Sequence, residues 1–188
     1  MRSGAPRRAR VSATAGTAAL ARRRLTVAQL GVLEITAHDH GLVEVVCCAL
    51  GDHSRLQAQS QDGPHPVLDA TERYLLAYGR APLHDGRTPR LPALPPLDLA
   101  GLSPFTRDVL AVTSSIPFGT ALTYGGVARL LGKPGAARAV GQALGRNPIP
   151  ILIPCHRVLA HQGVGGFTSG LPIKLMLMAL EDIVAAKR

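Results

Sequence analysis

Hydrophobic and polar residues alternate in two short stretches near the N-terminal end of the chain. The stretches cover residues 32–35 and 42–46, and they flank the cluster His38-Asp39-His40-Gly41. Alternation of this kind is typical of β-strands, and a short polar cluster with glycine between two such runs is typical of a turn. The pattern therefore predicts a β-hairpin.

Apolar residues recur at helical spacing over residues 66–78. The face that this spacing defines consists of Val67, Thr71, Tyr74, Leu75 and Tyr78. The spacing predicts a helix, and Gly79 is expected to stop it. Residues 81–104 then contain six prolines, which predicts an extended crossing between two domains. The many leucines of this crossing suggest that it packs against the rest of the protein.

Four further helices are predicted in the C-terminal half. One begins at Ser103-Pro104, two short ones cover residues 123–132 and 134–145, and the last begins at Pro172. The first is expected to pack through Phe105, Val109, Leu110 and Ile116, and the last through Ile173, Leu177, Leu180 and Val184. A tight Gly-Lys-Pro turn joins the two short helices, so they are a helix-turn-helix candidate.

The second short helix consists largely of alanine and glycine around Arg138. Such a slim surface could lie in a DNA groove, with Arg138 as its one long side chain. It could equally be a tightly packed core helix whose arginine extends to solvent. The sequence pattern alone leaves both readings open.

Charge is distributed unevenly along the chain. Residues 1–24 carry seven arginines and no acids, residues 25–100 carry a net charge of −4, and residues 101–188 carry +6, which together give +9. A basic C-terminal half is typical of a surface that meets a polyanion. Residues 1–24 have no steady apolar period, so we expect a disordered extension or a misassigned start.

The apolar runs, such as residues 42–50, are too short to span a bilayer, and the N-terminal residues lack the pattern of a secretory signal. We therefore expect a cytoplasmic protein with no membrane partner. Three cysteines are present. Cys47 and Cys48 are adjacent in a strand-like run, so at least one is expected to be buried. No spacing of cysteine and histidine resembles a zinc site, and no metal is expected.

The most unusual stretch of the sequence is residues 147–158, Asn-Pro-Ile-Pro-Ile-Leu-Ile-Pro-Cys-His-Arg-Val. Its three prolines exclude helix and favour extended geometry at the residues before them, and its isoleucines indicate burial. A rigid, buried support of this kind suits the presentation of reactive groups, here Cys155, His156 and Arg157.

Cys155 has the chemistry of a nucleophile, because a neighbouring imidazole and positive charge help to form a thiolate. Adjacent residues point in different directions, so we expect a water molecule between Cys155 and His156. Glu181 lies among apolar residues of the last predicted helix and needs a partner, for which His156 and Arg157 are the candidates. Glu181 could then hold the imidazole in its proton-accepting tautomer. A purely structural cysteine remains the alternative.

The segment Pro154-Cys155-His156-Arg157-Val158, preceded by Asn147-Pro148-Ile149-Pro150, resembles the active-site signature of the O6-alkylguanine-DNA alkyltransferases, also called methylated-DNA-protein-cysteine methyltransferases. Further motifs occur in the same order and spacing: Ile116-Pro117-Phe118-Gly119, Thr123-Tyr124-Gly125, residues 136–141 and the Gly-rich loop that leads to Lys174. The resemblance is strong over residues 103–186 and loose over residues 31–100.

The resemblance implies an α+β protein with a small, ribonuclease H-like N-terminal β-sheet domain and a helical C-terminal domain with a winged-helix-like helix-turn-helix. With the basic extension 1–24, the expected division is a domain over residues 25–90, a linker over 91–102 and the alkyltransferase domain over 103–188. The implied partner is double-stranded DNA containing O6-alkylguanine, with O4-alkylthymine as a second candidate substrate. No cofactor is implied, and we expect a monomer.

The resemblance also implies roles for individual residues. Cys155 would take the alkyl group irreversibly and once, with His156, water and Glu181 as a proton relay and Asn147 as a brace of the active-site turn. Arg138 would enter the base stack in place of the flipped nucleotide. The remaining implied contacts to DNA and the flipped base come from Tyr124, which also assists catalysis, the Val158 carbonyl and the Thr168 amide.

The loop Phe167-Thr168-Ser169-Gly170 departs from the Tyr-Ser-Gly-Gly that is common in the family, which leaves the alkyl-group preference open. Two other functions compete with alkyl transfer. A relative that binds alkylated DNA without repairing it would lack the cysteine, so Cys155 argues against it. A Cys-His hydrolase is disfavoured because its cysteine and histidine would be separated in sequence.

Overall fold

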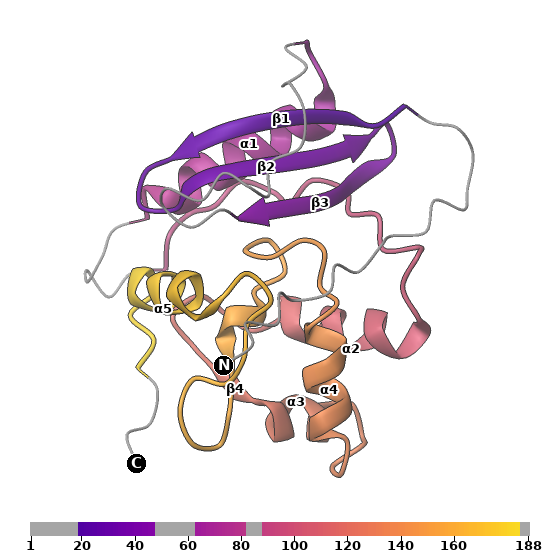
Figure 1. The fold of residues 1–188 in the computed structure, drawn as a ribbon, viewed down its shortest axis with the longest axis vertical. Coiled ribbons are helices and arrows are strands. Elements are labelled where there is room, and N and C mark those ends of the chain that lie inside the picture. The colour runs from indigo at the N-terminus through magenta and orange to yellow at the C-terminus, as the bar shows by residue number, and fades with distance from the viewer. Residues whose placement is uncertain (1–18, 48–62, 82–87, 185–188) are drawn as a thin grey trace, which may run out of the picture.

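The computed structural model describes residues 19–47, 63–81 and 88–184. The expectations for residues 1–18 and for Cys48 lie outside the described residues. Within them the chain is an α+β protein, with a three-stranded antiparallel sheet in its N-terminal part and most of its helices in the C-terminal part. Figure 1 shows the sheet above and the helices α2 to α5 below it.

The sheet has the order β1-β2-β3, with strands Ala21–Val27, Gly31–His38 and Gly41–Cys47. The predicted hairpin is confirmed, because β2 and β3 pair antiparallel around the expected turn. Cys47 is buried at the end of β3. The prediction that the chain has no fold before residue 25 is wrong for residues 21–24, which belong to β1.

The arginine-rich residues form a strand by pairing with β2, and an ion-pair network ties that strand to a helix. The guanidinium of Arg23 contacts Asp69 at 2.7 Å and Glu72 at 2.8 Å. Both acids lie on the helix α1, Pro66–Gly79, which packs on one face of the sheet (Figure 1). Arg23 therefore fastens β1 to α1, a long-range contact that charge composition could not reveal.

Helix α1 is confirmed with its expected buried face, which consists of Val67, Thr71, Tyr74, Leu75 and Tyr78. Gly79 is the last residue of the helix and not a stop signal beyond it. A Cβ atom on Gly79 would lie 2.4 Å from the Val27 side chain and 2.8 Å from the Ala28 carbonyl oxygen. The glycine is therefore required by the close approach of α1 to the end of β1.

The crossing that follows packs on the sheet, as its leucines suggested. Leu42 of β3 donates to the Pro96 carbonyl at 2.8 Å and accepts from the Asp98 amide at 2.9 Å. The imidazole of His38 contacts the Asp98 carboxylate at 2.7 Å. Part of the expected linker 91–102 is thus bound along the edge of β3.

The C-terminal helices α2, α3, α4 and α5 cover Pro104–Ser114, Tyr124–Leu130, Ala137–Leu144 and Leu171–Leu180, as the sequence predicted in outline. A short parallel pair, β4 (Leu122–Thr123) and β5 (Val158–Leu159), and a single 3-10 turn, η1 (Cys155–Arg157), complete this part. Ser103 and Thr123 cap α2 and α3 with their side chains, accepting from Thr106 and Gly126. Ile116 lies beyond the end of α2.

Helix α5 ends earlier than the apolar spacing predicted. Asp182 has a left-handed backbone with φ of 55°, and the Ile183 amide donates back to the Met178 carbonyl at 2.8 Å. This is a Schellman closure, which turns the chain out of the helix. Val184, expected on the buried face, is therefore 79% exposed, whereas Glu181 is 2% exposed.

The two parts of the molecule are packed together. Their buried apolar residues form one continuous cluster that extends from Leu25 in β1 to Leu180 in α5. The amide of Val45, on β3, donates to the carbonyl of Pro148 at 2.9 Å. No helix among the described residues is long and apolar enough to cross a membrane.

Candidate active site

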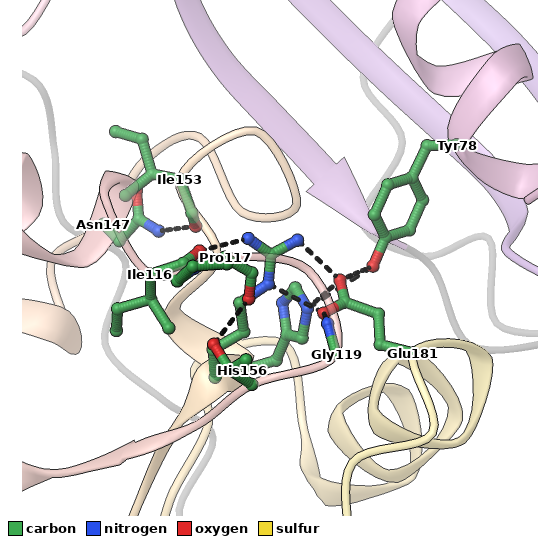
Figure 2. A network of polar contacts seen from close by, with 10 residues as sticks. Tyr78, Ile116, Pro117, Gly119, Asn147, Ile153, His156 and Glu181 are labelled. Carbon is green, nitrogen blue, oxygen red and sulfur yellow. Dashed lines mark hydrogen bonds and ion pairs between the residues drawn. The ribbon is translucent and has the colours of Figure 1, made fainter. Parts of the chain in front are cut away.

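The segment 147–158 forms a buried turn that Asn147 holds together. The Asn147 carboxamide accepts from the Ile149 amide at 3.0 Å and donates to the Ile153 carbonyl at 2.9 Å. Figure 2 shows this second bond. Ile151 has φ of 75°, a conformation that a β-branched residue rarely adopts. The prolines and Asn147 therefore maintain a backbone that isolated residues would avoid.

Cys155 begins the turn η1 within this segment. Its Sγ atom accepts a hydrogen bond from Asn147 Nδ2 at 3.1 Å, and the residue is 7% exposed. Burial raises the pKa of Cys155 to about 11, against the opposing effects of the Asn147 hydrogen bond and the Lys174 charge. The resting residue is therefore a thiol at neutral pH, and it needs a base to become a nucleophile.

His156 and Arg157 both turn toward Glu181, as Figure 2 shows for His156. His156 Nε2 lies 2.8 Å from Glu181 Oε1, while Arg157 donates from Nε to Oε2 at 2.7 Å and from Nη2 to Oε1 at 2.9 Å. Both partners that the sequence suggested for Glu181 are thus present. Burial opposes ionisation of Glu181, but the hydrogen bonds from His156 and Arg157 outweigh it and lower the pKa to about 2.

The ionised carboxylate determines the tautomer of His156. Because carboxylate oxygens only accept, Nε2 carries the hydrogen, and Nδ1 is the nitrogen that can accept a proton. This Nδ1 atom is buried and has no hydrogen-bond partner among the described residues. Burial lowers the pKa of His156 against the influence of Glu181. His156 is therefore a neutral base at physiological pH, adjacent in the chain to Cys155.

The motif at residues 116–119 surrounds the same carboxylate. The Ile116 carbonyl accepts from Arg157 Nη1 at 2.6 Å, and the Gly119 amide donates to Glu181 Oε2 at 3.3 Å. The Phe118 ring lies under the Arg157 guanidinium, and 5.6 Å separates the ring centroid from the guanidinium carbon atom. This motif is therefore a structural part of the His156–Glu181 site.

Lys174 is a buried cation that the site-residue predictions did not include. Its Nζ atom donates to the Val158 carbonyl at 2.8 Å and to the Gly166 carbonyl at 3.1 Å. The Tyr124 hydroxyl donates to the same Gly166 carbonyl at 3.3 Å. Burial lowers the pKa of Lys174 to about 8. Val158 and Tyr124, both predicted site residues, are thus linked through Lys174 and Gly166.

The remaining predicted residues lie at the surface. Arg138 is exposed at the start of α4, whose buried face consists of Val140, Ala143 and Leu144. This arrangement favours the reading in which Arg138 is available to a partner. Thr168 is exposed in the Gly-rich loop, and its hydroxyl donates to the Gly145 carbonyl at the end of α4 at 3.1 Å.

Comparison with known proteins identifies the family of the chain. The family model for the DNA-binding domain of 6-O-methylguanine DNA methyltransferase matches residues 104–183. The human methylated-DNA–protein-cysteine methyltransferase is 38% identical over 160 residues, which cover 81% of this chain and 76% of the human protein. The chain belongs to the methylated-DNA–protein-cysteine methyltransferase family.

Other members of the family match over about half of this chain. Methyltransferases of Thermococcus gammatolerans and Mycolicibacterium paratuberculosis are 42% and 50% identical, over 48% and 45% of this chain. Each of these two alignments spans only 52% of the relative's length. The Mycobacterium tuberculosis O6-methylguanine methyltransferase has a similar fold, with a TM-score of 0.67 and 28% identity over 90% of this chain and 97% of that one. The M. tuberculosis protein has also been crystallised in complex with DNA (TM-score 0.63, 29% identity, 88% of this chain and 95% of that one).

One more side chain of this site was not predicted from the sequence. Tyr78 of α1 donates to Glu181 Oε1 and lies 3.4 Å from His156 Nε2. It was predicted only as part of the apolar face of its helix, because helical spacing does not distinguish a buried tyrosine that packs from one whose hydroxyl serves a site. The sequence contained one signal, which is that Tyr78 lies on the predicted apolar face. A tyrosine hydroxyl that is buried, as Tyr78 is in the structure, needs a hydrogen-bond partner.

Proposed function

We propose that this protein repairs double-stranded DNA by transferring the alkyl group of O6-alkylguanine to Cys155, with O4-alkylthymine as a second candidate substrate. One observation carries the proposal. The buried thiol of Cys155 is held by Asn147, and the next residue, His156, has a neutral imidazole whose Nε2 atom is bound to the ionised carboxylate of Glu181. This is an arrangement of nucleophile, base and orienting acid.

His156 acts as the general base. The thiol of Cys155 holds its proton at neutral pH because burial raises its pKa to about 11. The neutral imidazole accepts this proton at Nδ1, through a water molecule, while Nε2 remains bound to Glu181. The imidazolium that forms is stabilised by the carboxylate, which does not itself take the proton.

The transfer is a direct displacement. A bond forms between Cys155 Sγ and the alkyl carbon while the bond from that carbon to O6 breaks, and the electron pair leaves with guanine. The departing guanine takes a proton from the Tyr124 hydroxyl, the proposed donor, and the tyrosinate is reprotonated from solvent. The His156 imidazolium releases the proton of the thiol to solvent through the same water. The thioether is not readily hydrolysed, so each molecule reacts once. The displacement itself requires no cofactor.

DNA binding is proposed for the surface around α4. Arg138 is exposed on a helix of small residues, which suits minor-groove insertion and replacement of a flipped base. Tyr124, the Val158 carbonyl and the Thr168 amide would then contact the flipped base. The finer fold descriptions, a ribonuclease H-like N-terminal part and a winged-helix-like C-terminal part, are proposed on the same family likeness.

The test is the mass of the cysteine peptides after incubation with a duplex oligonucleotide that contains one O6-methylguanine. We expect one added methyl mass on the peptide of Cys155 and none on that of Cys47, which is also buried and serves as an internal control. The Cys155→Ser variant should remain unmodified. Binding of the duplex without any methyl transfer would refute repair and support the alternative, a non-repairing protein that binds alkylated DNA.

A further inference from the structure

Tyr78 brings a hydroxyl from the N-terminal part of the chain into the His156–Glu181 site. It lies on the last turn of α1, separated from Glu181 by 103 positions in sequence. Figure 2 shows its ring directed toward the Glu181 carboxylate, to which the hydroxyl donates. The whole residue is buried, and its ring meets the Phe118 ring edge-on with 6.0 Å between centroids.

The carboxylate of Glu181 is saturated with donors. Oε1 accepts from Tyr78, from His156 and from Arg157 Nη2, while Oε2 accepts from Arg157 Nε and from the Gly119 amide. Tyr78 and His156 therefore share one oxygen. A donor on that oxygen draws negative charge away from the imidazole, and it also prevents the carboxylate from rotating.

The geometry points to Tyr78 as a positioning residue for alkyl transfer, which fixes the Glu181 carboxylate and limits the basicity of His156. The inference rests on the proposed function, since it concerns the base of that reaction. It assigns to α1, and so to the N-terminal part, a direct contact with the proton-transfer site. Tyr78 does not touch the thiol or the alkyl group in this role.

The direction of its effect follows from two opposing contacts. The bond from Tyr78 to Glu181 leaves less negative charge for His156 and so disfavours the imidazolium. The contact of the Tyr78 oxygen with His156 Nε2 would favour the imidazolium, but at 3.4 Å it lies beyond the usual length of a hydrogen bond. The first contact dominates. Removal of the hydroxyl should therefore make His156 more basic.

The other titratable or charged groups that face this pair come from three elements. They are Tyr74 on α1, Cys155 and Arg157 in η1, and Lys174 on α5. Lys174 and Cys155 titrate above pH 7. The acidic limb of the rate profile, which lies below the ordinary histidine pKa of 6.5, therefore reports on His156.

The experiment compares wild type with Tyr78→Phe, which keeps the ring and removes only the hydroxyl. Tyr74→Phe is the matched control, because Tyr74 is buried one turn earlier on α1 and its hydroxyl makes no hydrogen bond to the described residues. Two quantities are measured: the single-turnover rate of methyl transfer as a function of pH, and the pKa of His156 by nitrogen-15 NMR.

For Tyr78→Phe we expect the acidic limb and the NMR pKa of His156 to move upward together by about half a pH unit or more. The rate at neutral pH should fall about tenfold, because the carboxylate is free to rotate without the Tyr78 donor and no longer holds the imidazole in place. Tyr74→Phe should coincide with wild type in both measurements.

An unchanged or downward-shifted His156 pKa in Tyr78→Phe would overturn the inference, as would equal shifts in both variants. A purely structural role would lower the temperature of unfolding without moving either titration. Failure of the proposed function gives a different pattern: wild type transfers no methyl group, while the NMR titrations still report whether the Tyr78 hydroxyl controls the basicity of His156.

Discussion

Replacing Glu181 by glutamine tests the electrostatic account of the site most directly. In wild type the pKa of Glu181 is lowered from 4.5 to about 2. Each pH unit of difference between the folded and unfolded states is worth about 1.4 kcal/mol, so the ionised carboxylate contributes about 3 kcal/mol to the free energy of unfolding at neutral pH. Glutamine also leaves the buried Arg157 guanidinium without its counter-charge, a change that typically costs about 3–5 kcal/mol.

Both contributions have the same magnitude, and the titration of Glu181 gives stability a specific pH dependence. Between pH 4.5 and 2 the unfolded wild type binds a proton at Glu181 that the folded protein does not bind. Wild type therefore loses stability as the pH falls through this window, by about 1.4 kcal/mol per pH unit from this group. Glu181→Gln has no group to titrate there, so the gap between the two proteins should narrow toward pH 2.

The assay is urea unfolding at a series of pH values, followed by far-ultraviolet circular dichroism because the chain contains no tryptophan. The midpoint of thermal unfolding at pH 7 should fall by about 6–20 °C for a protein of this size. Glu72→Gln is the control. That carboxylate is 35% exposed, and its partner Arg23 keeps Asp69, so the loss should stay below about 1 kcal/mol.

Parallel stability curves for wild type and Glu181→Gln between pH 4.5 and 2 would refute this reasoning. A loss at pH 7 no larger than that of Glu72→Gln would refute it as well. Either result would mean that Glu181 is not held ionised by His156 and Arg157 in solution.

Two further predictions concern cations. Arg138→Ala should slow methyl transfer from duplex DNA more than transfer from a free O6-alkylguanine base, because a flipping residue acts only on a stacked substrate; equal losses in the two rate assays would assign Arg138 to the pocket instead. Burial lowers the pKa of Lys174 from 10.5 to about 8. Between pH 8 and 10.5 the unfolded chain therefore holds more protons at Lys174 than the folded protein does, and the free energy of unfolding of wild type rises with pH. Lys174→Met lacks this gain, and equal slopes of unfolding free energy against pH for the two proteins would contradict it.

Local features of this molecule were accessible from its sequence. The hairpin, α1 and the four C-terminal helices follow from alternation, helical spacing and caps such as Ser103 and Thr123, which act within a few residues. The partner of Glu181 was also predictable, because a carboxylate among apolar residues requires compensation. In each case the deciding interaction joins residues that are close in the sequence, or a single residue such as Glu181 cannot be buried without it.

Other features depend on contacts that no local pattern encodes. β1 contains three consecutive arginines and alternates only over residues 24–27; it forms by pairing with β2, and α1 supplies carboxylates for Arg23. Helix α5 was predicted too long because the apolar spacing continues to Val184, whereas the left-handed Asp182 ends the helix. Lys174 occupies a core position that hydropathy assigns to solvent, and two backbone carbonyls make its burial tolerable.

The active-site turn itself explains why the N-terminal part is more than an appendage. A left-handed β-branched residue such as Ile151 costs about 1–3 kcal/mol, and it persists only where its surroundings hold it. Asn147 holds the turn from within, and the edge of β3 holds it from outside through the bond from Val45 to Pro148. Tyr78 reaches the same site from α1. The sheet and its helix thus brace both the turn that carries Cys155 and the carboxylate that binds His156, so the geometry of the site depends on residues of the N-terminal part.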